Sequence, residues 1–174
     1  MLESGGFQPL RAVKPTRSIS PPGTYFVSTS TVGKRYIFQG MEIARVFLKT
    51  LYHYRREGAY LLHEFVLMPD HFHLLITPAP DVTLERAMQL IKGGSSRRLK
   101  LEGVFRGDVW QRGFTDHRIR DAEDYLSHKK YLLNNPVKRH LAETPEQYRY
   151  CSAYPGYKLD PWPSAAKAAI AGAP

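Results

Sequence analysis

The stretch "FVLMPDHFHLLITP" (residues 65–78) decides the fold. Two apolar runs meet at Pro69 and Asp70, residues typical of tight turns, so the stretch predicts a β-hairpin. Its second strand carries His71 and His73. Residues two apart on a strand point to the same face, about 6.6 Å from each other along it. The two imidazoles are therefore either ordinary histidines of a half-exposed strand or two ligands of one metal ion, which needs a third ligand from elsewhere.

The residues around this hairpin predict an α+β domain. The β-branched and aromatic run 24–32 predicts a strand, and residues 104–119 predict an irregular strand and loop. Apolar residues at helical spacing predict three helices, at residues 41–58, 83–103 and 121–136, the second weakened at Gly93 and Gly94. The order β-α-β-β-α-β-α predicts an antiparallel sheet with helices packed on one face.

Length and composition are those of one globular domain with two extensions. The 174 residues suffice for one core, and we expect a flexible basic arm (1–22), a folded domain (23–157) and a loose Ala/Pro-rich tail (158–174). No apolar run approaches the roughly 20 residues that span a bilayer, and the N-terminus lacks the apolar core of a secretory signal. The single cysteine, Cys151, excludes an intramolecular disulfide, so we expect a reducing cytoplasm.

Positive charge is concentrated in the centre of the chain. The formal net charge is +9, and residues 84–140 hold thirteen basic and seven acidic residues. Such an excess is either a binding surface for phosphates or a solvated face that maintains solubility. The candidate phosphate contacts, which are otherwise an ordinary exposed helix face, are Lys92, Arg97, Arg98 and Arg112. Trp110 or Phe114 could stack on an unpaired base, although a place in the core is the favoured interpretation for Trp110.

The last predicted helix offers a nucleophile and a third ligand. At 100° per residue from Ala122, its apolar stripe contains Tyr125, Leu126, Leu132 and Leu133. Tyr131 lies about 180° from Ala122, with Asn135 beside it one turn further on. Taken alone, Tyr131 is explained by surface packing, and Asn135, which precedes Pro136, by a role as a helix C-cap.

Taken together, these features resemble a known family. The segments "YFVSTSTVGKRYIF", "VLMPDHFHLLITP", "VWQRGF", "YLLNNPV" and "YRYCSAYPGY", spread over residues 24–156, resemble the HUH single-tyrosine nucleases. More narrowly, they resemble IS200-like transposases, in particular the REP-associated tyrosine transposases. Asp70 stands where that family commonly has Asn. The resemblance implies a ferredoxin-like fold of the HUH nuclease type.

The resemblance also implies a chemistry. His71 and His73 would hold a divalent cation, Mg²⁺ or Mn²⁺, with the amide oxygen of Asn135 as third ligand. Two imidazoles suit Mn²⁺ better than Mg²⁺. Tyr131 would attack the scissile phosphate, forming a 5′-phosphotyrosine from which the strand is rejoined. His128 is a weak candidate for the base that takes the proton from Tyr131.

The implied partner is single-stranded or hairpin DNA, at the nucleoid of the cytoplasm, and the resemblance leaves a homodimer open. Two other functions remain. One is a non-catalytic nucleic-acid-binding regulator derived from a transposase, which would keep the basic segment and lose the catalysis. The other is a metallohydrolase of small substrates with histidine ligands. The basic segment and the lack of an acidic ligand cluster argue against the hydrolase.

Overall fold

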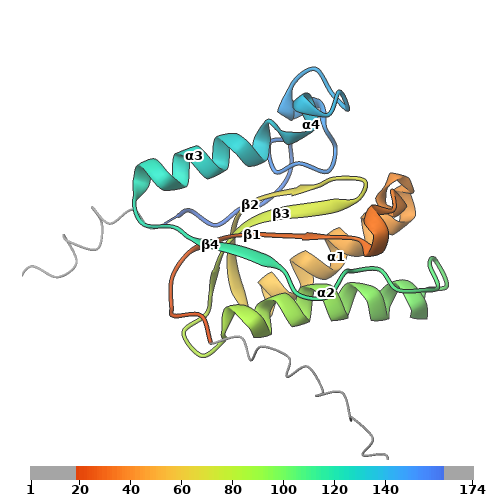
Figure 1. The fold of residues 1–174 in the computed structure, drawn as a ribbon, viewed down its shortest axis with the longest axis horizontal. Coiled ribbons are helices and arrows are strands. Elements are labelled where there is room, and N and C mark those ends of the chain that lie inside the picture. Colours follow the sequence, from red (N-terminus) through yellow and green to blue (C-terminus); the bar gives the residue numbers. More distant parts are fainter. Residues whose placement is uncertain (1–18, 163–174) are drawn as a thin grey trace, which may run out of the picture.

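A four-stranded antiparallel sheet forms the centre of the molecule (Figure 1). The structure is a computed structural model that describes residues 19–162. The strands are β1 (Tyr25–Ser30), β2 (Tyr60–Leu67), β3 (His71–Pro78) and β4 (Thr115–Arg118). They lie in the order β2-β3-β1-β4, which is the split β-α-β arrangement of ferredoxin-like folds. The antiparallel α+β architecture expected from the sequence is confirmed.

The helices are α1 (Met41–Arg56), α2 (Leu84–Leu101), α3 (Ala122–Leu133) and the short α4 (Asn135–Lys138). Three of the helices match the expected segments, and two of these, α2 and α3, begin at side-chain caps. The side chains of Thr83 and Asp121 accept hydrogen bonds from the first turns of α2 and α3. Three 3₁₀ turns lie at Val32–Lys34, Ile37–Gln39 and Pro145–Gln147. No helix of the described residues is long and apolar enough to cross a membrane.

The sequence predicts a weak point in α2 at Gly93 and Gly94. In the structure the helix is continuous there, and Gly94 lies at a close contact with α1. A Cβ atom on Gly94 would lie 2.6 Å from the ring of Tyr54 on α1, too close for a real contact. Gly94 therefore allows α1 and α2 to approach each other closely, and packing with α1 compensates for the low helix propensity of the glycine pair.

The sheet is covered on both faces. Helices α1 and α2 lie on one face and α3 lies on the other (Figure 1). Along β3, Phe72 and Leu74 belong to the core beneath α1 and α2, whereas Leu75 packs with Tyr125 and Leu132 of α3. The expectation of helices on one face therefore holds for α1 and α2 only. The reason is that β2 and β3 carry apolar side chains on both faces of the sheet, so helices must pack on both faces to exclude water.

Residues next to both expected domain boundaries pack against the sheet and helices. Asp160 forms an ion pair with Arg55 at 2.7 Å, and Trp162 stacks on Tyr125 with ring centroids 4.4 Å apart. Near the other end, Ser20 Oγ donates a hydrogen bond to Glu85 at 2.7 Å. We therefore propose that the folded unit extends to Trp162. The rest of the expected arm and tail lies outside the described residues.

Candidate active site

His71 and His73 lie side by side on the face of the sheet that α3 covers. They share the strand face of Leu75, their ring centroids are 4.8 Å apart, and their ring planes cross at 74°. The side chains are almost fully buried, at 8% and 6% exposure. Crossing ring planes allow the lone pairs of two imidazoles to point at one common ion. The structure thus brings the two expected ligands together in a geometry that suits coordination.

Asp70 fixes the orientation of His71. Its Oδ1 atom lies 2.6 Å from Nδ1 of His71, and the carboxylate is buried. Because an ionised carboxylate only accepts hydrogen bonds, Nδ1 carries a proton, and in the neutral tautomer of the ring the lone pair is on Nε2. Carboxylates hold metal-binding histidines in this way. From the sequence, Asp70 was interpreted as a turn residue and as a departure from the family pattern; a carboxylate next to a strand histidine was an available signal for its contact with His71.

His73 has two buried nitrogens that lack partners. Within the described residues, neither Nδ1 nor Nε2 of its ring makes a hydrogen bond. Burial, with a smaller contribution from His71, lowers the pKa of His73 to about 3, so its ring is neutral at physiological pH. A buried polar atom without a partner is unfavourable unless something else satisfies it. A neutral imidazole with a free lone pair beside a second one fits a divalent metal ion.

Tyr131 faces these histidines from α3. Its ring centroid lies 5.5 Å from that of His73 and 5.9 Å from that of Phe26, and the residue is 46% exposed. The ammonium of Lys138 lies 5.2 Å from the centroid of the Tyr131 ring. Phe26 also stacks on His73 with centroids 5.2 Å apart, so it helps to hold the histidine and the tyrosine together. Phe26 could not be identified from the sequence, because its contacts depend on the pairing of β1 with β3.

Asn135 is the first residue of α4, one turn after Tyr131, and is buried at 7% exposure. The C-cap of α3 is Asn134, whose side-chain amide donates to the carbonyl of Lys130 at 2.9 Å. The cap role considered for Asn135 therefore belongs to its neighbour. The amide of Asn135 makes no side-chain hydrogen bond within the described residues. No hydrogen bond of the described residues therefore occupies its side-chain oxygen.

The buried side of α3 differs from the expected apolar stripe. Tyr125 and Leu132 are buried as expected, but Leu126 is 61% exposed, and Asp124 is buried in its place. The physical cause is the partner of Asp124 on β4: His117 donates from Nε2 to its carboxylate at 2.9 Å. This contact turns the helix so that the carboxylate faces the sheet and Leu126 faces solvent.

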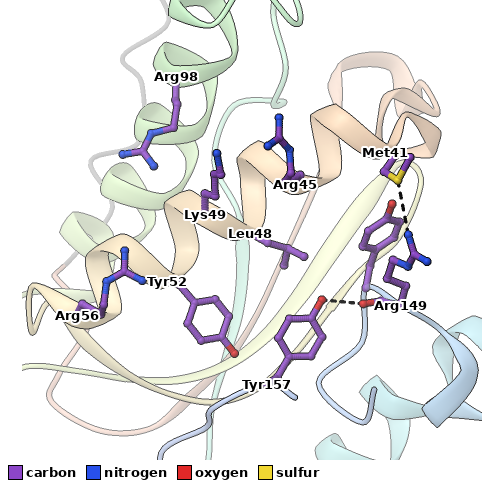
Figure 2. Close-up of a pocket in the computed structure, with 10 residues that line it drawn as sticks. Met41, Arg45, Leu48, Lys49, Tyr52, Arg56, Arg98, Arg149 and Tyr157 are labelled. Carbon is purple, nitrogen blue, oxygen red and sulfur yellow. Dashed lines mark hydrogen bonds between the residues drawn. The ribbon is translucent and has the colours of Figure 1, made fainter. Parts of the chain in front are cut away.

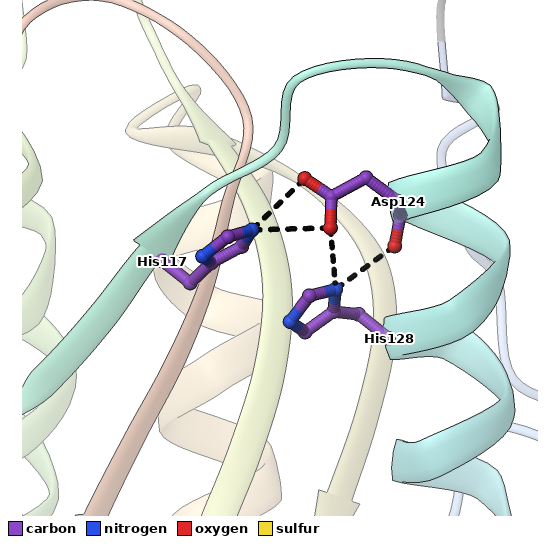
Figure 3. Close-up of side chains that lie close together, drawn as sticks. All are labelled: His117, Asp124 and His128. Atoms are coloured by element: carbon purple, nitrogen blue, oxygen red, sulfur yellow. Dashed lines mark hydrogen bonds and ion pairs between the residues drawn. The ribbon is translucent and has the colours of Figure 1, made fainter.

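A second group of candidate ligands lies beside the first, at the start of α3 (Figure 3). Ligand atoms of His117, Asp124 and His128 all lie within 4.8 Å of one another, so this cluster could hold a divalent metal ion. The rings of the two histidines are stacked, however, with centroids 4.5 Å apart and planes at 16°. Lone pairs in nearly parallel planes do not converge, so one ring would have to turn to bind metal. The ring planes of His71 and His73 cross at 74°, so this restriction does not apply to them.

His128 is tied into the same cluster. Its Nδ1 lies 2.8 Å from the main-chain oxygen of Asp124 and 3.1 Å from the carboxylate, so this nitrogen is a donor. Its ring packs on Phe26, with centroids 5.0 Å apart. The described residues thus give His128 a structural role in positioning α3. From the sequence, His128 was predicted only as a weak candidate for the base that takes the proton from Tyr131.

Asp124 is expected to stabilise the fold in a pH-dependent way. Burial acts to raise the pKa of its carboxyl, but hydrogen bonds from His117 and Arg120 outweigh burial and hold the pKa well below its usual range. The folded state therefore favours the carboxylate. This stabilisation is present above the unfolded pKa of about 4 and is lost as the pH falls below it. We expect Asp124→Asn to lower the free energy of unfolding by about 1–3 kcal/mol at pH 7.

Urea unfolding at pH 7 and pH 3 tests this expectation. The wild type and Asp124→Asn should differ at pH 7 and approach each other at pH 3. Asp108→Asn, which changes an exposed carboxylate, is the control and should follow the wild type at both values. A gap between wild type and Asp124→Asn that is equally large at pH 3 would mean that charge on Asp124 does not stabilise the fold.

The basic residues expected at the DNA have different environments. Lys92 is half-buried, and its ammonium donates to the carbonyls of Gln111, at 2.8 Å, and of Gly113. These hydrogen bonds connect α2 to the loop before β4. Burial also lowers the pKa of Lys92. Arg97 and Arg112 are exposed. Arg98 lines a groove beside α1.

Trp110 belongs to the core, as the favoured interpretation predicted. It stacks on Phe38 with centroids 5.0 Å apart, and its ring nitrogen donates to Ser95 at 3.0 Å. A ring that is held on its face and at its nitrogen is not free to stack on a base.

Comparison with known proteins identifies relatives in sequence. The family model described as "Transposase IS200 like" matches residues 25–135. A candidate REP-associated tyrosine transposase of Haemophilus influenzae is 30% identical over 107 residues, which cover 56% of this chain and 61% of that protein. A REP-associated tyrosine transposase of Escherichia coli K12 is 29% identical over 85 residues, 48% of each chain. The chain thus spans about half to three-fifths of the length of these relatives.

Solved structures show the same fold. A REP-associated tyrosine transposase bound to a REP hairpin superposes with a TM-score of 0.63 at 22% identity, covering 80% of this chain and 82% of that one. A candidate transposase from Deinococcus radiodurans has a TM-score of 0.50 at 19% identity, covering 70% and 97% of the two chains. At these identities the likeness establishes the architecture of the sheet and helices.

Proposed function

The chain belongs to the IS200-like transposase family, and we propose that it is a metal-dependent transposase that cuts and rejoins hairpin-forming single-stranded DNA through a 5′-phosphotyrosine. The observation that carries this proposal is the meeting of His71, His73 and Tyr131, which come from two separate elements. The hairpin DNA bound by the structural relative supports the choice of substrate.

In this proposal the metal ligands are His71, His73 and Asn135. His71 binds through Nε2, because Asp70 occupies its Nδ1. His73 offers a nitrogen that otherwise lacks a partner, and Asn135 offers its amide oxygen. When bound, the cation polarises a non-bridging oxygen of the scissile phosphate. Two imidazole ligands favour Mn²⁺ over Mg²⁺.

Tyr131 is the proposed nucleophile. Its phenolic oxygen attacks phosphorus and loses its proton to solvent, the bond from phosphorus to the 3′ oxygen breaks, and a 3′-hydroxyl leaves. The new bond from tyrosine to phosphorus keeps the energy of the phosphodiester, so a later attack by a 3′-hydroxyl rejoins the strand and restores the phenol. The ammonium of Lys138 lies 5.2 Å from the centroid of this ring, so its positive charge favours the phenolate form of Tyr131.

The two other functions receive less support. A regulator without catalysis would not need His71, His73 and Tyr131 to meet in one place. A small-molecule hydrolase would not need the excess of basic residues in segment 84–140. We therefore retain DNA cleavage and transfer as the proposed activity.

Incubation with a library of single-stranded hairpins and Mn²⁺ tests the proposal. The expected product is a covalent protein–DNA adduct that survives denaturing electrophoresis, and EDTA should prevent it. Plain duplex DNA of the same composition is the control and should give little adduct. Tight, metal-independent hairpin binding without any adduct would instead support the regulator.

A further inference from the structure

A carboxylate is buried where α3 packs on the sheet. Glu64 of β2 is 4% exposed, and both of its side-chain oxygens have partners. The ammonium of Lys129, on α3, lies 2.5 Å from Oε1, and the hydroxyl of Ser152 donates to Oε2 at 2.6 Å. Lys129 precedes Tyr131 by two residues on the same helix. The ion pair therefore connects the helix of the proposed nucleophile directly to the sheet.

An irregularity in β2 turns Glu64 towards α3. Between Leu62 and Glu64 the register with β3 shifts by one residue, so Glu64 pairs with Leu75. A regular ladder would pair it with Leu74, which faces α1 and α2. Residues that pair across two strands point to the same face, so this β-bulge places the carboxylate on the face that α3 covers. Bulges that redirect a side chain are over-represented next to active sites.

Two polar contacts connect α3 to the two edge strands of the sheet. Asp124 contacts His117 of β4, and Lys129 contacts Glu64 of β2. Five positions separate Asp124 from Lys129, so they lie about 140° apart around the helix. A rotation of α3 about its axis moves one of them towards the sheet and the other away from it. Together the two contacts therefore fix the rotation of the helix, with Tyr131 over the central strands.

Apolar packing contributes less to this rotation. In α3, which the structure describes in full, Tyr125 and Leu132 are the buried apolar side chains, and Leu126 is exposed. A buried ion pair adds little to stability, because removing two charges from water costs about as much as their attraction returns. Its better-supported use is to specify one arrangement of packed elements. The burial of Glu64 is thus explained by orientation of the helix more readily than by stability.

We propose that Glu64 is a positioning residue for Tyr131: its ion pair with Lys129 fixes the rotation of α3 and so directs the phenol towards His73. The role of Tyr131 as nucleophile rests on the proposed function. The phenolic oxygen lies at the end of a long side chain, so a small rotation of the helix displaces it. A misplacement of about 1 Å can lower the rate of a reaction about 100-fold.

The test removes both charges of the pair together. Glu64→Gln keeps an oxygen that can accept from Ser152, and Lys129→Met keeps an apolar stem, so the double variant does not bury an unpaired charge. We expect the rate of adduct formation at saturating hairpin and Mn²⁺ to fall at least about tenfold. The affinities for hairpin and Mn²⁺, measured by fluorescence anisotropy and calorimetry, should not change, because the net charge and the proposed metal ligands are unchanged.

Two further proteins show whether the effect belongs to this ion pair. Lys129→Arg keeps a cation that can bind the carboxylate of Glu64, and it should keep the wild-type rate. Arg55→Met/Asp160→Asn removes another partly buried ion pair, again without a change of net charge. Arg55 is next to Arg56 on α1 (Figure 2), and α1 lies on the other face of the sheet from α3 (Figure 1). This control should therefore form the adduct at the wild-type rate.

Hydrogen exchange measures the orientation of α3 without reference to activity. The amides of Ala122–Leu133 should exchange at least about tenfold faster in Glu64→Gln/Lys129→Met than in the wild type, and those of Met41–Arg56 should not change. The midpoint of urea unfolding should stay close to that of the wild type, because replacing both partners of a buried pair is often neutral. A midpoint that falls together with hairpin affinity would make the pair a general support of the fold and would overturn the proposal.

A failure of this proposal is distinct from a failure of the proposed function. If the wild type forms the adduct and the double variant forms it equally fast, Glu64 does not position Tyr131. If the wild type forms no adduct with any hairpin, the proposed function fails, and hydrogen exchange alone decides about the ion pair. Faster exchange of α3 then supports the pair as the contact that fixes this helix, and unchanged exchange overturns it.

Discussion

Tyr131→Phe is expected to lower covalent adduct formation at least about 1,000-fold, because the variant lacks the only oxygen placed to attack phosphorus in the proposed site. The lost hydroxyl belongs to a residue that is 46% exposed, so folding and DNA binding should change little. The ring itself remains, and with it the contacts to His73 and Phe26. The measurement is the yield of adduct with a cleavable hairpin and Mn²⁺.

Tyr125→Phe is the matched control on the same helix. Tyr125 is buried against Trp162, and burial, with a smaller contribution from Glu64, raises the pKa of its phenol. It is therefore a poor nucleophile, and its variant should keep the adduct. Tyr148 is excluded for a similar reason, since its hydroxyl donates to the carbonyl of Leu67 at 3.0 Å.

Peptide mapping of the trapped adduct gives an independent result. A phosphotyrosine at Tyr131 supports the proposal. A phosphotyrosine at another position, or an adduct that persists in Tyr131→Phe, would show that α3 does not supply the nucleophile.

His71→Ala and His73→Ala are each expected to weaken Mn²⁺ binding at least about 100-fold and to abolish the adduct, because each removes one of two imidazole ligands. Titration calorimetry with Mn²⁺ measures the first effect directly, without reference to activity. Because His73 is buried, circular dichroism should confirm that its variant is folded, and His73→Gln provides a second variant of similar volume.

Two further variants test the carboxylate next to His71 and a histidine that lies outside the proposed metal site. Asp70→Asn keeps an acceptor for Nδ1 of His71 but removes the charge, so we expect an intermediate loss of metal affinity, about 10–100-fold. His53→Ala removes an imidazole on α1 and should have no effect. If His117→Ala abolishes Mn²⁺ binding and His71→Ala does not, the metal is held by the cluster of Figure 3 instead.

The local spacing of apolar residues and the positions of capping residues were enough to predict the helices and strands of this protein. The period of apolar residues located α1 and α3, and Thr83 and Asp121 marked helix starts that the structure confirms. The spacing of two residues along β3 is enough to predict that His71 and His73 share one face of the strand, as the structure shows. These features depend on residues within one or two turns of each other, so the chain determines them without reference to distant segments.

Tertiary structure alone decided what surrounds those residues. Which face α3 covers depended on the burial of both sides of β2 and β3, and the rotation that exposes Leu126 depended on His117, a residue of another element. Phe26 reached His73 and Tyr131 only through the pairing of β1 with β3. The groove beside α1 joins this helix to residues about 100 positions further along the chain. Such contacts follow from how the apolar faces are buried together, and no local period encodes them.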